Sequence, residues 1–323
     1  MKTNYFYIGI DLGGTNVRII AVEERTKRIL VYRKETFQKA NSGEKELSIN
    51  IFRLVDEVCD VCKAKETVIG GIGMALAASF NRKTGVITKW PNNPKWNGIH
   101  LMEALEKRYQ IPVVLEDDAN AAALGELIAG KGIGYHDLVY VTISTGIGCG
   151  IVINDKLLTG QCGGAGELGH IKVTEDTILC NCGAYGCLQA IASGPAILKR
   201  YLGFTKQSSQ NFELQQVVEY AQSGDLAAIE TFRMAGEHVG RAIANIAILL
   251  DISLFILGGG VMRAGSFIMY PIEEAISDSL QDKKKIKLIV SEDSDRSGVF
   301  GALALLHQHV SLNKNYLRGR ESR

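Results

Sequence analysis

The stretch Tyr5-Phe-Tyr-Ile-Gly-Ile-Asp-Leu-Gly-Gly-Thr-Asn16 leads from an apolar strand pattern into a turn of glycine and threonine, and a second strand pattern follows from Val17 to Ala21. The same order returns in Asp137-Leu-Val-Tyr-Val-Thr-Ile-Ser-Thr-Gly-Ile-Gly148, where a strand pattern continues from Cys149 to Ile153. A motif of strand, Gly/Thr turn and strand that occurs twice suggests two related halves.

Strands and helices alternate along the rest of the chain, and glycines stand at several strand ends. We expect further strands at 29–33, 68–74, 112–115, 253–257 and 286–290, and helices at 46–63, 119–129, 227–249 and 298–308. This alternation predicts an α/β fold whose ligands bind at the carboxyl ends of the strands. With 323 residues and 46% hydrophobic content, the chain is long enough for two domains with separate cores.

Both Gly/Thr turns have the composition of an anion-binding site. Glycines let backbone N–H groups turn toward an anion, and Thr15 or Thr145 adds a hydroxyl donor. Neither turn matches a P-loop, and neither opens a dinucleotide-binding helix, because each leads into a second strand. Together with Gly258-Gly-Gly260 at the end of another strand, they favour a nucleotide phosphate site over three purely structural turns.

A cluster of metal-ligand residues follows in Glu167-Leu-Gly-His170 and Cys180-Asn-Cys-Gly-Ala-Tyr-Gly-Cys187. One imidazole and three thiols at this spacing form the ligand set of a closed, tetrahedral zinc site, namely His170, Cys180, Cys182 and Cys187. The alternatives are unligated thiols or a disulfide. The chain opens without a signal-peptide pattern, so we expect a cytoplasmic protein whose reduced thiols favour metal.

Composition excludes several classes of partner. The chain has 36 Lys and Arg residues against 35 Asp and Glu, a net charge of +1, so no basic face for nucleic acid is implied. No apolar run approaches the ~20 residues that cross a bilayer, so we expect no membrane association. The polar, basic tail 311–323 is expected to be a frayed terminus.

The two turns, the Glu-x-Gly-His and Cys-x-Cys-Gly-x-x-Gly-Cys motifs and the late Leu-Gly-Gly-Gly-Val together resemble the ROK sugar kinases, a family that includes bacterial glucokinases. The resemblance runs from about Tyr7 to Leu306. It implies the actin-like (ribonuclease H-like) ATPase fold, with two α/β domains around a cleft. The expected small domain is 1–118 plus 302–323, and the expected large domain is 119–301 with the zinc motif.

The resemblance also implies ATP-dependent phosphorylation of a hexose at the 6-hydroxyl, as in glucokinases. Mg²⁺ would accompany ATP, zinc would be structural, and the protein would form a homodimer or homotetramer. The family's repressors carry an added N-terminal helix-turn-helix, and this chain starts directly at its first strand, which disfavours that class.

Roles for individual residues follow from the same resemblance. Asp118 matches the catalytic base. Sugar contacts are assigned to Asn92, Asp117, Asp118, Glu167, His170 and Gln189. Phosphate contacts are assigned to Asp11, Gly13, Gly14, Thr15, Thr145, Gly146, Gly148, Gly258, Gly259 and Gly260. Phosphoryl transfer does need a base, donors around the phosphates and Mg²⁺. For Asp118 the alternative is a helix N-cap, and Asp117 and Asp118 could divide the two roles either way.

Three positions depart from the family pattern, namely Gln189 in place of Glu, Asp117 in place of Asn, and Ala75-Leu76 in place of Pro-Gly. Gln189 both donates and accepts hydrogen bonds. If the side chains of Asp117 and Asp118 both point inward, repulsion between the two carboxylates raises the pKa of at least one of them. The loop at Ala75-Leu76 is expected to follow a different path. ATP use is unaffected, but an N-acetylhexosamine (ManNAc or GlcNAc) kinase or a weakly active sugar-binding regulator stay as alternatives.

Overall fold

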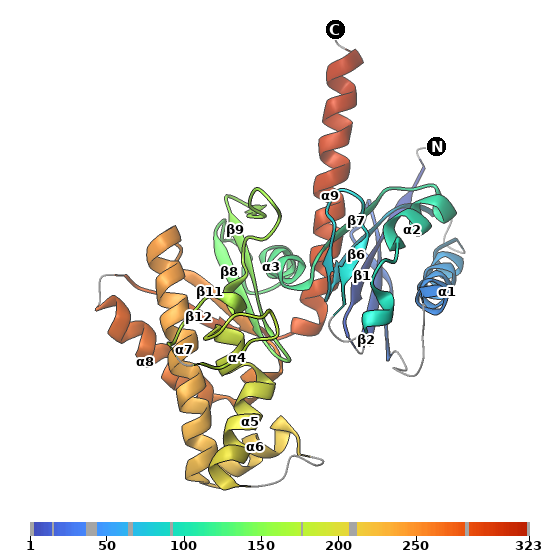
Figure 1. The fold of residues 1–323 in the computed structure, drawn as a ribbon. Helices are drawn as coiled ribbons and strands as arrows, with labels where there is room; N and C mark the ends of the chain where they lie inside the picture. The colour runs from blue at the N-terminus through green and yellow to red at the C-terminus, as the bar shows by residue number, and fades with distance from the viewer. Residues whose placement is uncertain are drawn as a thin grey trace. The chain divides into compact units, whose positions relative to one another are not determined.

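The computed structural model describes residues 3–14, 16–36, 44–63, 67–90, 93–175, 177–206, 212–281 and 284–321 (Figure 1). The chain forms two compact units. Unit 1 comprises Met1–Ile133 together with Asp293–Arg323, and unit 2 comprises Gly134–Glu292. Both are mixed α/β, as the alternation of strands and helices predicts.

Unit 1 is built on a five-stranded sheet in which a meander of three antiparallel strands is extended by two parallel strands. In sheet order the strands are β3 (Ile29–Thr36), β2 (Asn16–Glu23), β1 (Tyr5–Leu12), β4 (Val68–Leu76) and β7 (Val113–Asp117). The first Gly/Thr turn joins β1 to β2, and the Gly13 N–H donates to the Asn16 carbonyl at 2.9 Å.

Ala75 and Leu76, which depart from the family pattern, lie in a strand rather than in a loop. Strand β4 continues through both residues, which pair with Asp11 and Leu12 of β1 and with Glu116 and Asp117 of β7. Both side chains are fully buried. The segment expected to be a loop is therefore part of a strand, in which apolar residues at both positions are buried.

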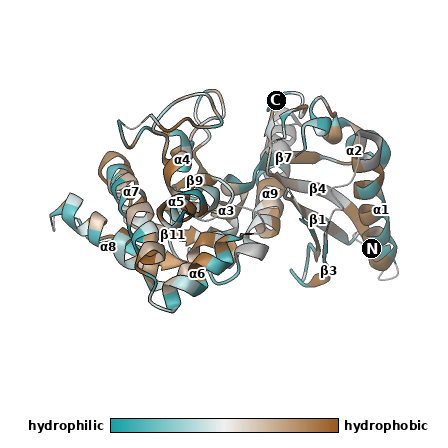
Figure 2. Ribbon diagram, turned by 60° about the horizontal axis from the view of Figure 1, so that its bottom comes forward, coloured by the Kyte–Doolittle hydropathy of each residue, from teal (hydrophilic) through white to brown (hydrophobic). Residues whose placement is uncertain are grey.

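One face of this sheet is covered by α1 (Glu44–Lys63) and α2 (Leu101–Tyr109), with β5 (Ser79–Phe80), β6 (Ile87–Lys89) and the 3₁₀ helix η1 (Pro94–Trp96) nearby. Helix α1 is amphipathic, and Figure 2 shows brown and teal residues along it. Its apolar positions recur every three or four residues and lie in the core, namely Leu47, Ile51, Leu54, Val55, Val58, Cys59 and Cys62. The C-x-x-C of this helix is therefore a pair of core residues.

Helices α3 (Asp118–Ala129) and α9 (Ser294–Glu321) cross in backbone contact. A Cβ atom at Gly125 would lie 1.9 Å from the Ser297 carbonyl oxygen, and one at Gly301 would lie 1.6 Å from the Ala121 carbonyl oxygen. This contact assigns α3 and the first turns of α9 to unit 1, whereas the sequence placed 119–301 in the other domain. Helix α9 also runs through much of the tail expected to fray.

Unit 2 repeats the strand arrangement of unit 1. In sheet order its strands are β10 (Lys156–Leu157), β9 (Ile147–Ile153), β8 (Leu138–Ile143), β11 (Leu254–Gly258) and β12 (Lys287–Val290). Strands β8 to β10 are antiparallel neighbours, and β11 and β12 run parallel to β8. The repeated sequence motif therefore corresponds to two sheets with the same strand order.

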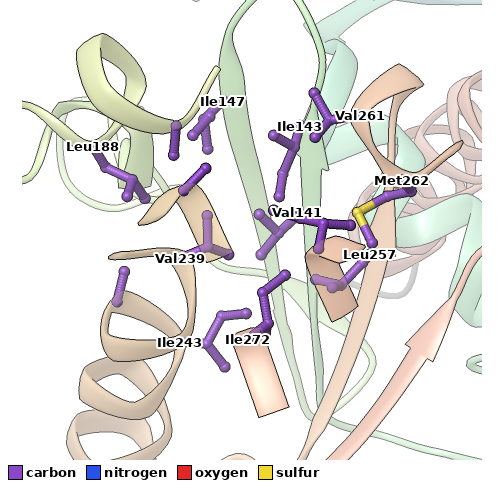
Figure 3. Packing of buried hydrophobic residues seen from close by; sticks show 14 of the residues in the cluster. Val141, Ile143, Ile147, Leu188, Val239, Ile243, Leu257, Val261, Met262 and Ile272 are labelled. Atoms are coloured by element: carbon purple, nitrogen blue, oxygen red, sulfur yellow. The ribbon is translucent and has the colours of Figure 1, made fainter. Parts of the chain in front are cut away.

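The helices of unit 2 are α4 (Leu188–Ala192), α5 (Gly194–Thr205), α6 (Leu214–Gln222), α7 (Leu226–Leu250) and α8 (Ser266–Leu280), with 3₁₀ helices η2 (Leu168–His170) and η3 (Gly260–Ala264). Figure 3 shows Val141 and Ile143 of β8 facing the core with Ile243 of α7, while Ile147 and Leu188 lie close to each other. Within the described part of the chain, no helix is long and apolar enough to cross a membrane.

Candidate active site

The junction between β7 and α3 separates the roles of two adjacent carboxylates. Asp117 is the N-cap of α3, and its Oδ1 accepts hydrogen bonds from the backbone N–H groups of Ala119 at 3.0 Å and Asn120 at 3.3 Å. Asp118 is the first helical residue. The side chain of Asp118 is therefore not engaged as the cap, and the alternative raised by the sequence applies to Asp117 instead.

The surroundings of Asp118 favour its protonated form. Burial has the largest effect and raises the pKa of Asp118 well above its usual value. The negative charges of Asp117 and then Asp11 raise this pKa further, and backbone N–H groups offset part of the effect. The side chain is half-buried by accessible area, so a substrate can reach it. Such a carboxylate accepts a proton more readily than an ordinary aspartate.

A buried ion pair fixes this junction. Glu116 is only 3% exposed, and two N–H groups of Arg82 donate to its oxygens at 2.6 and 2.5 Å. The same carboxylate accepts from the Asn120 side chain at 3.1 Å and from the Asp117 N–H at 2.9 Å. The hydrogen bonds to Glu116 raise the pKa of Arg82. The sequence offered no signal for this pair, since Arg82 lies far from Glu116 along the chain.

Asp11 lies at the carboxyl end of β1, opposite Arg18 on β2. The Arg18 Nη1 donates to Asp11 Oδ2 at 2.9 Å, and Asp11 is 8% exposed. Helix α9 approaches this carboxylate closely, because a Cβ atom at Gly298 would lie 2.9 Å from Asp11 Cγ. Gly13 and Gly14 form the turn beyond it, while Thr15 and Asn92 lie outside the described residues.

In unit 2 the second Gly/Thr turn is bonded to Gln189. The Ile147 N–H donates to Gln189 Oε1 at 3.0 Å. Since a backbone N–H can only donate, the side-chain atom that faces it has to be the amide oxygen. A Cβ atom at Gly146 would lie 2.7 Å from that oxygen, so a larger residue here would displace the Gln189 side chain. Thr145 is exposed, and Gly148 pairs with Thr142 of β8.

Gly258, Gly259 and Gly260 stand beside this turn, because β11 is the parallel neighbour of β8. Two of them are required by packing. A Cβ atom at Gly258 would lie 2.1 Å from Tyr140 Oη, and one at Gly259, whose φ is +93°, would lie 2.3 Å from the Ile143 carbonyl oxygen. Gly260 is exposed at the start of η3. The two turns thus share the carboxyl edge of the sheet, where α/β proteins bind ligands.

The structure brings the four predicted metal ligands together. One ligand atom from each of His170, Cys180, Cys182 and Cys187 lies within 4.8 Å of the others. The Sγ atoms of Cys182 and Cys187 are 3.7 Å apart, as are Cys180 Sγ and His170 Nδ1. Tetrahedral zinc with bonds of about 2.3 Å places its ligand atoms about 3.8 Å apart. The donor set and its dimensions therefore fit zinc.

The imidazole of His170 has a second neighbour. Its Nε2 lies 3.9 Å from Glu167 Oε2, on the side away from the thiols. A histidine that faces the ligand cluster with one nitrogen and a carboxylate with the other is typical of metal sites.

Two of the thiols differ in acidity. Burial raises the pKa of Cys187 to about 12, whereas hydrogen bonds, first from the Ala184 N–H, lower the pKa of Cys182.

The cluster connects to the second Gly/Thr turn through backbone contacts. A Cβ atom at Gly169 would lie 2.3 Å from the Ile147 carbonyl oxygen, which explains the glycine of Glu-Leu-Gly-His. The Leu188 N–H donates to the Ile171 carbonyl at 3.0 Å, and Arg200 Nη2 donates to the Ile191 carbonyl at 2.8 Å. These contacts hold α4 to the residue that follows η2 and to α5, and Gln189 of α4 bonds to the turn. Arg200 is a further residue that sequence patterns did not reveal.

Comparisons with known proteins agree with this geometry. A family model described as the ROK family matches residues 7–309. A glucokinase of Thermotoga maritima is 31% identical over 94% of this chain and 98% of its own length. The structure of a ROK hexokinase from Thermus thermophilus superposes with a TM-score of 0.82 at 29% identity, covering 92% of this chain and 96% of that one. A ROK family glucokinase from Streptomyces griseus, in complex with glucose and AMPPNP, gives a TM-score of 0.72 at 31% identity, with 93% and 98% covered.

Proposed function

The chain belongs to the ROK family, and we propose that it transfers the terminal phosphoryl group of ATP to the 6-hydroxyl of a hexose through Asp118 as the base. The chain is an ATP-dependent sugar kinase with the actin-like fold of its relatives.

The observation that carries the proposal is the separation of Asp117 from Asp118. Because Asp117 caps α3, Asp118 keeps its carboxylate for the substrate, and the raised pKa of Asp118 makes it a suitable acceptor for the hydroxyl proton. As the hydroxyl loses its proton to Asp118, its oxygen attacks the terminal phosphorus of ATP and ADP leaves. The ion pair between Arg82 and Glu116 keeps the junction in place.

The phosphate groups of ATP are assigned to the two Gly/Thr turns and to Gly260. Exposed Thr145 is an available donor, as are the backbone N–H groups of these turns other than those of Gly13, Ser144 and Ile147, which already donate within the protein. Mg²⁺ bound with ATP supplies charge neutralisation on the phosphates. Asp11 is the residue that would orient the hydrated ion, because Arg18 holds its carboxylate at the end of β1.

Zinc is assigned a structural role in the His170, Cys180, Cys182 and Cys187 cluster. All four positions are protein ligands, so the site is closed, as structural zinc sites are. The ion would join η2, which Glu167 directly precedes, to the residues that lead into α4. Thiols kept for a metal also support a reducing compartment such as the cytoplasm.

The orientation of Gln189 bears on the choice of sugar. Gln189 Oε1 accepts a hydrogen bond from the Ile147 N–H, so the side-chain group that can contact a substrate is the NH₂ group, which donates. A glutamate at this position would offer an acceptor instead. A carbonyl oxygen on the sugar can only accept, so an N-acetylhexosamine is the second candidate beside glucose. Hydroxyl groups can donate or accept and satisfy either side chain.

A coupled ADP assay tests both parts of the proposal. The sugars are glucose, mannose, allose, fructose, N-acetylglucosamine and N-acetylmannosamine, and the phosphate position in the product is read by NMR. Turnover with at least one hexose or hexosamine, and a 6-phosphate product, is the expected result. Sugar binding without turnover across the whole panel would contradict the proposal and favour a regulatory protein.

The Gln189→Glu variant sharpens the choice of sugar. It should shift the ratio of kcat/KM for the N-acetylated sugar over glucose downward by about tenfold, since one hydrogen bond to a charged group is worth roughly 1.5–3 kcal/mol. An unchanged ratio would show that Gln189 does not select the sugar.

A further inference from the structure

Glu126 lies near the end of α3 and is a buried carboxyl group that the catalytic roles leave unused. It is only 2% exposed. The Ser297 hydroxyl on α9 donates to its Oε1 at 2.7 Å, and the Lys131 N–H donates to its Oε2 at 2.9 Å. Each carboxyl oxygen therefore holds a different segment of the chain.

These two segments are the connections between the units. The chain leaves unit 1 after Ile133 and returns to it at Asp293. Lys131 belongs to the turn that precedes the first connection, and Ser297 lies in the helical turn that follows the second. The Ser297 N–H also donates to the Asp293 carbonyl at 3.2 Å. One buried side chain thus holds the unit 1 ends of both connections.

The backbone around Glu126 is shaped to admit this carboxyl group. A Cβ atom at Gly130 would lie 2.1 Å from Glu126 Oε2, and one at Gly125 would lie 1.9 Å from the Ser297 carbonyl oxygen. The Glu126 carbonyl also accepts from the N–H groups of Gly130 at 3.1 Å and Gly132 at 2.9 Å. The first connection is therefore held by the side chain and the main chain of the same residue.

We propose that Glu126 is a positioning residue that fastens the two connections to each other, so that they act as one pivot when the units move. Any such motion has to be absorbed by backbone rotation at these two segments. Gly134, with φ of +87° and open space around its Cβ position, adjoins the pivot and can absorb that rotation. The two connections are coupled because both depend on one side chain: a buried carboxyl group left without one partner is destabilised, and any shift of that group would also weaken its bond to the other partner.

Hydrogen exchange on the full chain tests this coupling directly. The Ser297→Ala variant removes a contact at the second connection only. We expect exchange to rise about tenfold in 293–300 and also in the peptide that contains Lys131 and Gly132, because hydrogen bonds to a charged group have that scale. A rise confined to 293–300 would overturn the proposal, since the two connections would then be anchored separately.

Two further variants distinguish the loss of the Glu126 contacts from a general loss of stability. Glu126→Gln keeps an oxygen for the Lys131 N–H and gives an NH₂ group that the Ser297 hydroxyl can accept, so exchange should stay near the wild-type level in both segments. Ile51→Ala makes a cavity in the core of unit 1, away from both connections. If Ile51→Ala raises exchange in the two segments as much as Ser297→Ala does, the pivot is refuted.

Enzyme kinetics give a second readout, which rests on the proposed function. Residues at a hinge change kcat and KM together. We expect Ser297→Ala and Glu126→Ala to change both parameters for the sugar and lower kcat/KM by about tenfold, with recovery in Glu126→Gln. Values within twofold of Ile51→Ala would contradict the proposal. If the protein turns over no sugar, the exchange experiment alone decides, so the two failures are distinguishable.

Discussion

The carboxyl end of β7 in unit 1 and the carboxyl end of β8 in unit 2 hold their functional groups by different means. At β7 the groups are charged side chains, and neighbouring charges position them, as Arg82 does for Glu116. At β8 the backbone itself is the functional element, and glycines such as Gly146 and Gly169 allow other segments to approach it. Substitutions should therefore act on charge and pKa in the first region and on packing in the second.

The largest effect is expected from Asp118→Asn in the first region. Loss of the base should lower kcat by about 10²–10⁴-fold. Because the folded pKa of Asp118 is raised, its stabilising contribution exists only at low pH and is lost as pH rises through that pKa. The variant should therefore have a higher Tm than the wild type at pH 7. Sugar-dependent ADP formation and thermal melts measure both effects.

The control for this variant is Asp117→Asn, which keeps the side-chain oxygen that caps α3. It should retain most of the activity. Undiminished turnover in Asp118→Asn would show that another group is the base. The carboxylates at the end of β7 would then not act through charge and pKa as the comparison of the two regions requires.

Removal of a metal ligand should have the next largest effect. Cys182→Ser leaves three of the four ligands, so zinc affinity should fall by more than about 100-fold, since even loss of a residue behind the ligands costs 10–100-fold. KM for the sugar should rise because, without zinc, η2 and the residues that lead into α4 are no longer joined through a common ion. Metal analysis by mass spectrometry and kinetics provide the test. Cys162→Ser, an exposed cysteine outside the cluster, is the matched control, and full zinc occupancy in Cys182→Ser would contradict the ligand set.

A methyl group added where η2 contacts β9 should destabilise the protein, because it disrupts packing. Gly169→Ala forces a Cβ atom against the Ile147 carbonyl and should lower the free energy of unfolding by about 1–3 kcal/mol. Gly164→Ala meets nothing within 4 Å and should change stability by less than about 0.5 kcal/mol. Urea denaturation compares the two. Equal effects would mean that close backbone approach does not organise this region.

The smallest effect is a shift in the pH dependence of activity. The base has to be ionised, so kcat/KM should fall as pH drops through the raised pKa of Asp118, at a higher pH than for an ordinary aspartate. Asp117→Asn removes the neighbouring charge that helps to raise this pKa. The acid limb of its profile should therefore move to lower pH while the cap is kept. A limb that does not move would show that Asp117 leaves the base unaffected.

Local patterns predicted those parts of the protein that depend on residues close in the chain. The clustering of His170, Cys180, Cys182 and Cys187 was predicted from spacing alone, because three thiols and an imidazole that lie close in the chain can reach a common point. The repeated strand and turn motif predicted two related halves, and both sheets have the same strand order. Glycines at strand ends likewise marked the turns beside β8 and β11.

Contacts between distant segments escaped sequence reasoning. Arg82 meets Glu116, Arg200 meets Ile191, and Ser297 meets Glu126. None of these residues stands in a recognisable pattern, because their side chains become neighbours only when separate elements pack. The same holds for the boundary at Ile133, which depends on how α3 crosses α9.

The amino-acid sequence by itself determined the α/β class and the family, and it predicted the cluster of His170, Cys180, Cys182 and Cys187 that the structure brings together, since these depend on short-range spacing and on residue chemistry. Only the tertiary structure decided that Asp117 rather than Asp118 caps α3, and that the Gln189 side-chain oxygen accepts from the Ile147 N–H. The physical reason is that desolvation and hydrogen-bond partners are supplied by elements far apart in the chain, and these elements determine which of two similar groups acts.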